Sequence, residues 1–180
     1  MIIKPGSDKL KQILKRGEIF EGEYLPRVLE ILENVRKNGD KAVMDYTGRF
    51  DGFEIKSPED MLIPQEEITA AVESLPYGII KAFTDAYARI YAFHEKQLEK
   101  SWFYEEDGVL LGQKVTPLDR VGLYVPGGKA AYPSSVLMNA VPAKVAGVKE
   151  IIMTTPTPGG QYNPAVLAAA SVLGIDKVYR

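Results

Sequence analysis

One strand–turn–helix–strand pattern in the last third of the sequence constrains the fold more than any other feature. The apolar run of residues 121–125 predicts a buried strand, and the Pro-Gly-Gly turn after it leads into a helix predicted over residues 134–146. Ser134 is suited to cap this helix and Gly147 to end it, and residues 150–154 predict the next strand. This order is typical of α/β proteins, whose parallel sheets bind ligands at the carboxyl ends of the strands.

The same alternation continues to the end of the sequence. Asn163 followed by Pro164 predicts the start of another helix, Gly174 its end, and residues 176–179 a third strand. The expected class is therefore α/β, with three parallel strands joined by right-handed helical crossovers. Pro142 lies inside the first of these helices and has no N–H to donate, so we expect a kink or a break there.

The preceding part of the sequence is expected to be mainly helical. Proline, glycine and capping residues mark five predicted helices. The first covers residues 9–16, with Ser7 or Asp8 as its cap and Gly17 at its end, and the second has Pro26 in its first turn and ends at Gly39. The third is capped by Asp40 and ends near residues 48–52, and the last two begin at Pro64 and Pro76. The last carries an apolar stripe from Ile79 to Leu98, which we interpret as core or subunit interface.

Two shorter signals lie between and after these helices. Residues 61–63 predict a short extended piece. Asp107-Gly108, placed between Trp102-Phe-Tyr and Val109-Leu-Leu, predicts a β-hairpin that bridges the helical part to the sheet.

Composition excludes several classes of function. The formal net charge of −2 over 180 residues offers no field that would recruit nucleic acid or an anionic membrane. The absence of cysteine excludes disulfides and thiolate zinc sites within this sequence. The first residues have no apolar core of a signal peptide, and no apolar run approaches the ~20 residues that span a bilayer, so we expect a cytoplasmic protein.

The turn after the first predicted strand has two interpretations. Pro126, Gly127 and Gly128 form either a plain tight turn or a loop whose glycines let the backbone approach a ligand and donate N–H groups to it. Tyr124, beside the turn, either meets a ring, ribose or phosphate or is a half-buried core residue. The fingerprint G-x-G-x-x-G is absent, but residues 154–160 follow the second strand at the same edge, which favours a crevice there.

Other candidate residues have simpler interpretations. His94 is the only histidine, and a lone histidine on a helix is more often structural than a base or a metal ligand. Lys129 either meets a phosphate or is simply exposed. The acidic candidates have no spacing that singles out acid–base catalysis, so we interpret them as caps, turns and solvated faces: Asp40, Asp45, Asp51, Glu54, Glu105, Glu106 and Asp107.

Four segments make the sequence resemble the N-terminal part of the histidinol dehydrogenases. They are residues 35–43 with 46–52, residues 93–97, residues 112–147, and residues 166–170 leading into 178–180. The most specific of them contains Arg-Val-Gly-Leu-Tyr-Val-Pro-Gly-Gly, which starts at Arg120.

The resemblance implies an incomplete Rossmann-like domain and an NAD- and zinc-dependent enzyme. Members of this family oxidise L-histidinol to L-histidine through the aldehyde, in histidine biosynthesis, and form intertwined homodimers in which a Glu-His pair handles protons. Their motif tyrosine contacts NAD and corresponds to Tyr124, and Pro126, Gly127 and Gly128 would form the loop beside it.

The resemblance also sets limits on residues 1–180. Family members are more than twice as long, and their zinc ligands, Glu-His pair and other NAD contacts would lie beyond residue 180. We therefore expect no catalytic and no metal-binding residue here, and a fragment that is inactive by itself. Its three-stranded sheet should leave an unpaired edge and exposed apolar helix faces, so we expect aggregation or a poorly cooperative melt.

The expected organisation has three parts: an N-terminal arm or helix over residues 1–20, a mainly helical part with the hairpin over 21–118, and the first part of a NAD-binding domain over 119–180. Two alternative functions remain open at this point. One is a related dehydrogenase of another small alcohol, such as a sulfonated diol. The other is a non-catalytic nucleotide-binding module.

Overall fold

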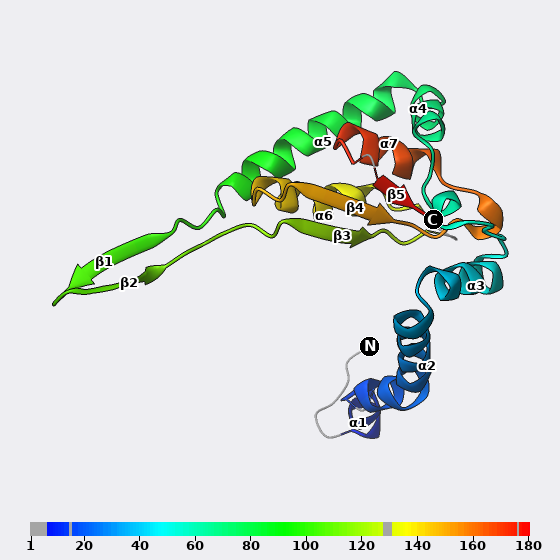
Figure 1. The fold of residues 1–180 in the computed structure, drawn as a ribbon, viewed down its shortest axis with the longest axis horizontal. Helices are drawn as coiled ribbons and strands as arrows, with labels where there is room; N and C mark the ends of the chain where they lie inside the picture. Colours follow the sequence, from blue (N-terminus) through cyan, green and yellow to red (C-terminus); the bar gives the residue numbers. More distant parts are fainter. Residues whose placement is uncertain (1–6, 15, 128–130, 176) are drawn as a thin grey trace.

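The computed structural model describes residues 7–14, 16–127, 131–175 and 177–180, and it shows an α/β fold (Figure 1). Its sheet is formed by β3 (Arg120–Tyr124), β4 (Glu150–Thr154) and β5 (Lys177–Tyr179), which run parallel in the order β3-β4-β5. Helix α6 (Pro133–Val145) connects the first pair and α7 (Pro164–Val172) the second. The predicted alternation of strands and helices is confirmed.

Most of the predicted helix ends in this part are confirmed. The Asn163 side chain accepts a 2.9 Å hydrogen bond from the backbone N–H of Ala165, and Gly147 and Gly174 adopt φ values of 89° and 60° just beyond the two helices. The N-cap predicted at Ser134 is wrong. Tyr132 holds that position, and α6 begins at Pro133, because proline already has a helical φ and lacks the N–H that a first turn leaves unpaired.

Pro142 does not divide α6, so the predicted break is wrong. The helix is continuous from Pro133 to Val145. Four of its side chains are buried in the core: Val136, Leu137, Ala140 and Val141. Their packing offsets the one backbone hydrogen bond that the proline cannot donate.

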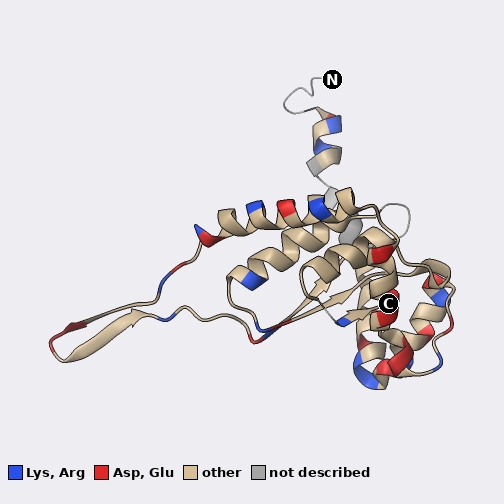
Figure 2. Cartoon of the chain, turned by 90° about the horizontal axis from the view of Figure 1, so that it is seen from above, with Lys and Arg blue, Asp and Glu red and all other residues tan. Residues whose placement is uncertain are grey.

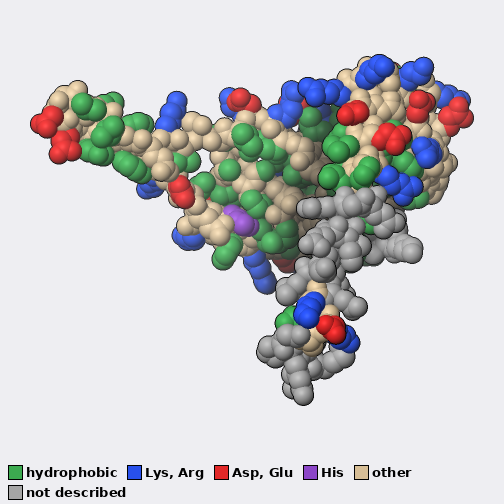
Figure 3. All heavy atoms as spheres, turned by 90° about the horizontal axis from the view of Figure 1, so that it is seen from below, with side chains coloured by type: hydrophobic (Ala, Val, Ile, Leu, Met, Phe, Trp, Pro, Cys, Tyr) green, Lys and Arg blue, Asp and Glu red, His purple; other side chains and the backbone are tan. Residues whose placement is uncertain are grey.

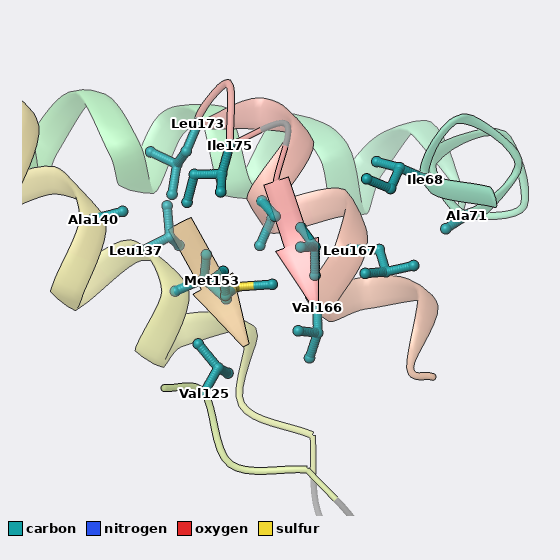
Figure 4. Packing of buried hydrophobic residues seen from close by; sticks show 14 of the residues in the cluster. Ile68, Ala71, Val125, Leu137, Ala140, Met153, Val166, Leu167, Leu173 and Ile175 are labelled. Atoms are coloured by element: carbon teal, nitrogen blue, oxygen red, sulfur yellow. The ribbon is translucent and has the colours of Figure 1, made fainter. Parts of the chain in front are cut away.

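The core lies on one face of the sheet (Figure 4). Val125, Met153 and Val178 are fully buried there beneath the apolar residues of α6 and α7. Helix α5 (Tyr77–Glu95) packs on these two helices, and its apolar stripe covers them. This confirms the interpretation of that stripe as core for Phe83, Tyr87, Ile90 and Tyr91.

The N-terminal helices have other bounds than the sequence predicts. They are α1 (Asp8–Leu14), α2 (Arg16–Asn38) and α3 (Asp40–Asp51). Helix α1 ends two residues before the predicted end at residue 16, whereas α2 and α3 are longer than predicted. Gly17 and Pro26 both lie inside α2, so the predicted end at Gly17 and start at Pro26 are wrong. Gly17 is in the first turn, where N–H groups have no partner in the helix, and Pro26 removes only one bond from a helix of 23 residues.

The starts of the next helices agree with the sequence prediction, except that α3 is capped one residue earlier. Gly39, at φ 57°, is the N-cap of α3, so the cap predicted at Asp40 is one residue off. A short 3-10 helix, η1 (Pro58–Met61), and α4 (Gln65–Glu73) follow, with Pro64 and Pro76 at the predicted starts of α4 and α5. The apolar stripe of α2 is about half exposed, as expected for an uncovered helix face: Leu25, Val28, Leu29 and Leu32.

One edge of the sheet is covered, contrary to expectation. Leu62 forms an antiparallel bridge with Tyr179. The N–H of Ile63 donates to the carbonyl of Val178, and the N–H of Arg180 donates to the carbonyl of Met61, both at 2.8 Å. The predicted extended piece therefore completes the outer edge of β5, and the expected unpaired edge is wrong for that strand.

The predicted hairpin is confirmed and stands away from the rest of the chain (Figures 1 and 2). Strands β1 (Trp102–Glu106) and β2 (Val109–Gln113) are antiparallel, and Asp107 and Gly108 join them with φ values of 51° and 73°.

Among the described residues, none of the helices is long and apolar enough to cross a membrane.

Candidate functional site

Three hydroxyl-bearing side chains form a row at the carboxyl edge of the sheet. Tyr124 at the end of β3 is paired in register with Thr154, and Thr154 with Tyr179. Successive strand residues point to opposite faces, and the neighbours Val125, Met153 and Val178 are buried in the core. The row therefore lies on the face of the sheet that is turned away from the core, and Tyr124 is 62% exposed there.

The surface beside Tyr124 is flat. Gly122 precedes Tyr124 by two residues on the same face, and a Cβ added at Gly122 would meet no atom within 4 Å. Its partner across the strands is the partly buried Ile152. A tyrosine ring, an apolar side chain and a bare backbone suit the face of a planar ring, while the three hydroxyls can donate or accept hydrogen bonds.

The amino end of this same face is ionic. Glu150 lies between Arg120 and Lys177, and its Oε1 is 2.6 Å from the Lys177 Nζ, while its Oε2 accepts from the Arg120 Nε. The hydrogen bond from Lys177, and then that from Arg120, lowers the pKa of Glu150 below its ordinary value of 4.5. This end of the face therefore carries two cations on one carboxylate, whereas Tyr124, Thr154 and Tyr179 at the carboxyl end are uncharged.

This ion pair makes the stability of the chain depend on pH in a defined direction. A carboxylate with a lowered pKa stabilises the folded state above its unfolded pKa, and the contribution is lost as pH falls through the folded value. We expect the difference in free energy of unfolding between wild type and Glu150→Gln to shrink between about pH 7 and about pH 3, in urea titrations followed by circular dichroism. High salt should shrink it at neutral pH as well. A difference that stays constant with pH would exclude this role.

The loop after β3 packs tightly against the loop after β4. The N–H of Val125 donates to the carbonyl of Thr154 at 2.9 Å, and a Cβ added at Gly127 would lie 2.7 Å from the carbonyl oxygen of Pro156. Gly127 is thus needed for the close approach of the two loops. Pro126 is exposed beside Tyr124, whereas Gly128 and Lys129 lie outside the described residues.

The loop after β4 reaches the same edge, as the sequence predicts. It contains a short 3-10 helix, η2 (Pro158–Gly160), and the buried Thr157, whose Oγ1 has no hydrogen-bond partner in the described part of the chain. A Cβ added at Gly160 would lie 2.6 Å from the Phe53 ring. Phe53 therefore holds this loop against the segment that follows α3.

The remaining candidates are not brought to this edge. His94 lies near the end of α5, with its Nδ1 2.5 Å from the Oε1 of Gln97. Glu105, Glu106 and Asp107 are at the tip of the hairpin. Over the described ranges, no group of three or more histidine, cysteine, aspartate or glutamate side chains is arranged to hold a metal ion.

The sequence did not identify Tyr179 as a site residue, and it indicated Thr154 only as the first residue of the loop 154–160 expected at this edge. Each stands at the end of a predicted strand, and the carboxyl ends of parallel strands share one edge, so their position carried a usable signal. Which residues share a face with Tyr124 depends on the register, and this only the structure supplies.

The sequence of the chain is similar to the proteins of one enzyme family. The profile of the histidinol dehydrogenase family matches residues 14–180. Curated histidinol dehydrogenases that are similar to the chain include those of Aquifex aeolicus, with 53% identity over 174 residues, and Nitrosospira multiformis, with 55% identity over 171 residues. These alignments cover 97% and 94% of the chain but only 40% and 39% of the relatives. The chain thus spans about two fifths of their length.

A solved structure agrees with the sequence comparison. The crystal structure of histidinol dehydrogenase from Elizabethkingia anophelis superposes with a TM-score of 0.80 at 34% identity. The superposition covers 88% of the chain and 36% of the solved one. Most of the fold described above therefore has a counterpart in that protein.

Proposed function

The chain belongs to the histidinol dehydrogenase family, and from this premise we propose that it forms part of the NAD-binding half of an enzyme that oxidises L-histidinol to L-histidine. In this proposal the dinucleotide lies along the carboxyl edge of the sheet, beside Tyr124, Pro126, Gly127 and Gly128. When bound, NAD supplies the acceptor for the hydride that leaves the substrate alcohol.

One observation carries the proposal: the Tyr124 ring is 62% exposed at a strand end, on a face that is open at Gly122. A ring in this position can stack on a base or hydrogen-bond to a ribose or phosphate. Thr154 and Tyr179 add two hydroxyls to the same row, and Gly127 brings the β4 loop against it. These residues bind and orient the dinucleotide, and they move no proton in the reaction.

Zinc and the substrate enter the proposal through the family alone. The described residues offer no set of metal ligands, so no step is assigned to a metal here. We propose that the chain by itself forms no NADH from L-histidinol. A homodimer and a biosynthetic role in histidine formation belong to the same proposal.

The test is an NMR titration of the isotope-labelled chain with NAD. We expect weak binding that shifts the amide signals of Gly122, Tyr124, Thr154 and Tyr179. The amides of the hairpin serve as an internal control and should not move, and adenosine monophosphate and nicotinamide mononucleotide, added separately, identify the half of NAD that lies on Tyr124. An absence of shifts, or shifts confined to other elements, would refute the proposed NAD surface.

A further inference from the structure

Thr154, at the end of β4, occupies the middle of the row of hydroxyls at the carboxyl edge. It is exposed and stands in register between Tyr124 and Tyr179. Strand β3 ends the described sheet on one side, so a ligand that lies on Tyr124 and continues over the sheet crosses β4 next. Adjacent strands lie about 4.8 Å apart, so a nucleotide whose base stacks on Tyr124 brings its ribose over Thr154.

The surface around Thr154 is neutral. The loop that follows it, residues 155–163, contains no charged side chain. Lys177 lies on the same face of the sheet, in β5, but its Nζ is 2.6 Å from the Oε1 of Glu150. This cation is therefore paired with a carboxylate at the amino end of the sheet, away from the carboxyl edge.

Two further groups of charges also lie away from Thr154. The Arg180 side chain is only 9% exposed, and its guanidinium lies 5.4 Å from the centre of the Phe53 ring, with Nη2 3.6 Å from the Oε1 of Glu67. The acidic side chains of the hairpin are at its far end, where it projects from the body of the molecule (Figure 3). Within the described ranges, Thr154 therefore meets a ligand as a neutral hydroxyl.

The charge of the residue at the ribose decides between NAD and NADP in dinucleotide-binding βαβ units. A carboxylate accepts a hydrogen bond from the ribose 2′-hydroxyl of NAD, whereas an arginine holds the 2′-phosphate of NADP. Thr154 ends the second strand of such a unit and is neither of these. Its hydroxyl can donate to or accept from a ribose hydroxyl, and it does not repel a phosphate.

We propose that Thr154 contacts the ribose of the dinucleotide and determines how strongly this edge prefers NAD over NADP. The inference rests on the proposed function and assigns a specificity-determining residue to the same surface. Because the hydroxyl is neutral, the edge tolerates the 2′-phosphate of NADP with only a modest loss of affinity. A charge introduced at Thr154 changes the preference in the direction given by its sign.

The test is the ratio of the NADP and NAD dissociation constants, measured by NMR titration of the isotope-labelled chain. In wild type, NADP should bind less than about tenfold more weakly than NAD. Thr154→Asp should raise this ratio about tenfold, because the carboxylate repels the 2′-phosphate, and Thr154→Arg should lower it by a similar factor. Thr84→Asp is the matched control, since it adds the same charge at an exposed threonine on α5 and should leave the ratio unchanged.

The outcomes separate this inference from the NAD surface itself. If the chain binds NAD but either Thr154 variant leaves the ratio unchanged, or the control changes it as much, the role of Thr154 is refuted and the NAD surface stands. NADP binding that is far more than tenfold weaker in wild type refutes it in the same way. A chain that binds neither dinucleotide refutes both. Thr154 is exposed, so both variants should fold, which amide spectra outside the edge verify.

Discussion

Gly160→Ala is expected to lower the free energy of unfolding by about 2–5 kcal/mol, whereas Gly159→Ala should lower it by only about 1–2 kcal/mol. Both glycines have left-handed backbones, with φ values of 77° and 61°, so alanine is strained at either position. They differ in their surroundings. A Cβ at Gly160 would lie 2.6 Å from Phe53, and a Cβ at Gly159 would meet no atom within 4 Å.

Urea denaturation of the two variants measures the difference directly. Trimming the ring in Phe53→Leu should recover part of the loss caused by Gly160→Ala and none of the loss caused by Gly159→Ala. Equal destabilisation by both glycine variants would contradict the contact between Phe53 and the loop. The contact matters for the site because it joins the segment after α3 to the loop at the carboxyl edge of the sheet.

Residues with strong local backbone preferences made much of the fold predictable from the sequence. Asn163-Pro164 and Asp107-Gly108 specify a helix start and a hairpin turn through their own backbone preferences, and both are confirmed. The strand at Glu150–Thr154 has the predicted bounds, because turn residues flank an apolar run.

The wrong predictions concern positions where local preference competes with a longer element. The sequence predicts a helix end at Gly17 and a helix start at Pro26, yet α2 continues through both residues. Pro142 is held within α6 by the burial of its neighbours Val141 and Ala140. In each case the cost of one unfavourable residue is smaller than the free energy gained by the rest of the helix.

Contacts between distant segments gave no signal in the sequence. The pairing of Leu62 with Tyr179 and the packing of Gly160 on Phe53 join residues more than a hundred positions apart. For the candidate site, Tyr124 was predictable from its place at a strand end. Its neighbours Thr154 and Tyr179 follow from the register, which a single sequence does not specify.

Tyr124→Ala is expected to have the largest effect on NAD binding. Loss of a base stacked on an aromatic ring costs about 1–3 kcal/mol, so the dissociation constant should rise about 5- to 150-fold. Tyr124→Phe keeps the ring and should retain most of the affinity if stacking dominates, whereas a hydrogen bond from the hydroxyl would make it resemble Tyr124→Ala. Because Tyr124 is 62% exposed, its replacement should change stability by no more than about 0.5 kcal/mol.

The most direct test of the NAD surface is the ratio of NAD dissociation constants between wild type and Tyr124→Ala, measured by NMR titration of the folded chain. Tyr77→Ala is the matched control, since Tyr77 is 80% exposed at the start of α5, on a different element. We expect at least a fivefold weaker affinity for Tyr124→Ala and no change for Tyr77→Ala. The same affinity in wild type and Tyr124→Ala, or wild-type chain that shows no response to NAD, would contradict the assignment of this edge to the dinucleotide.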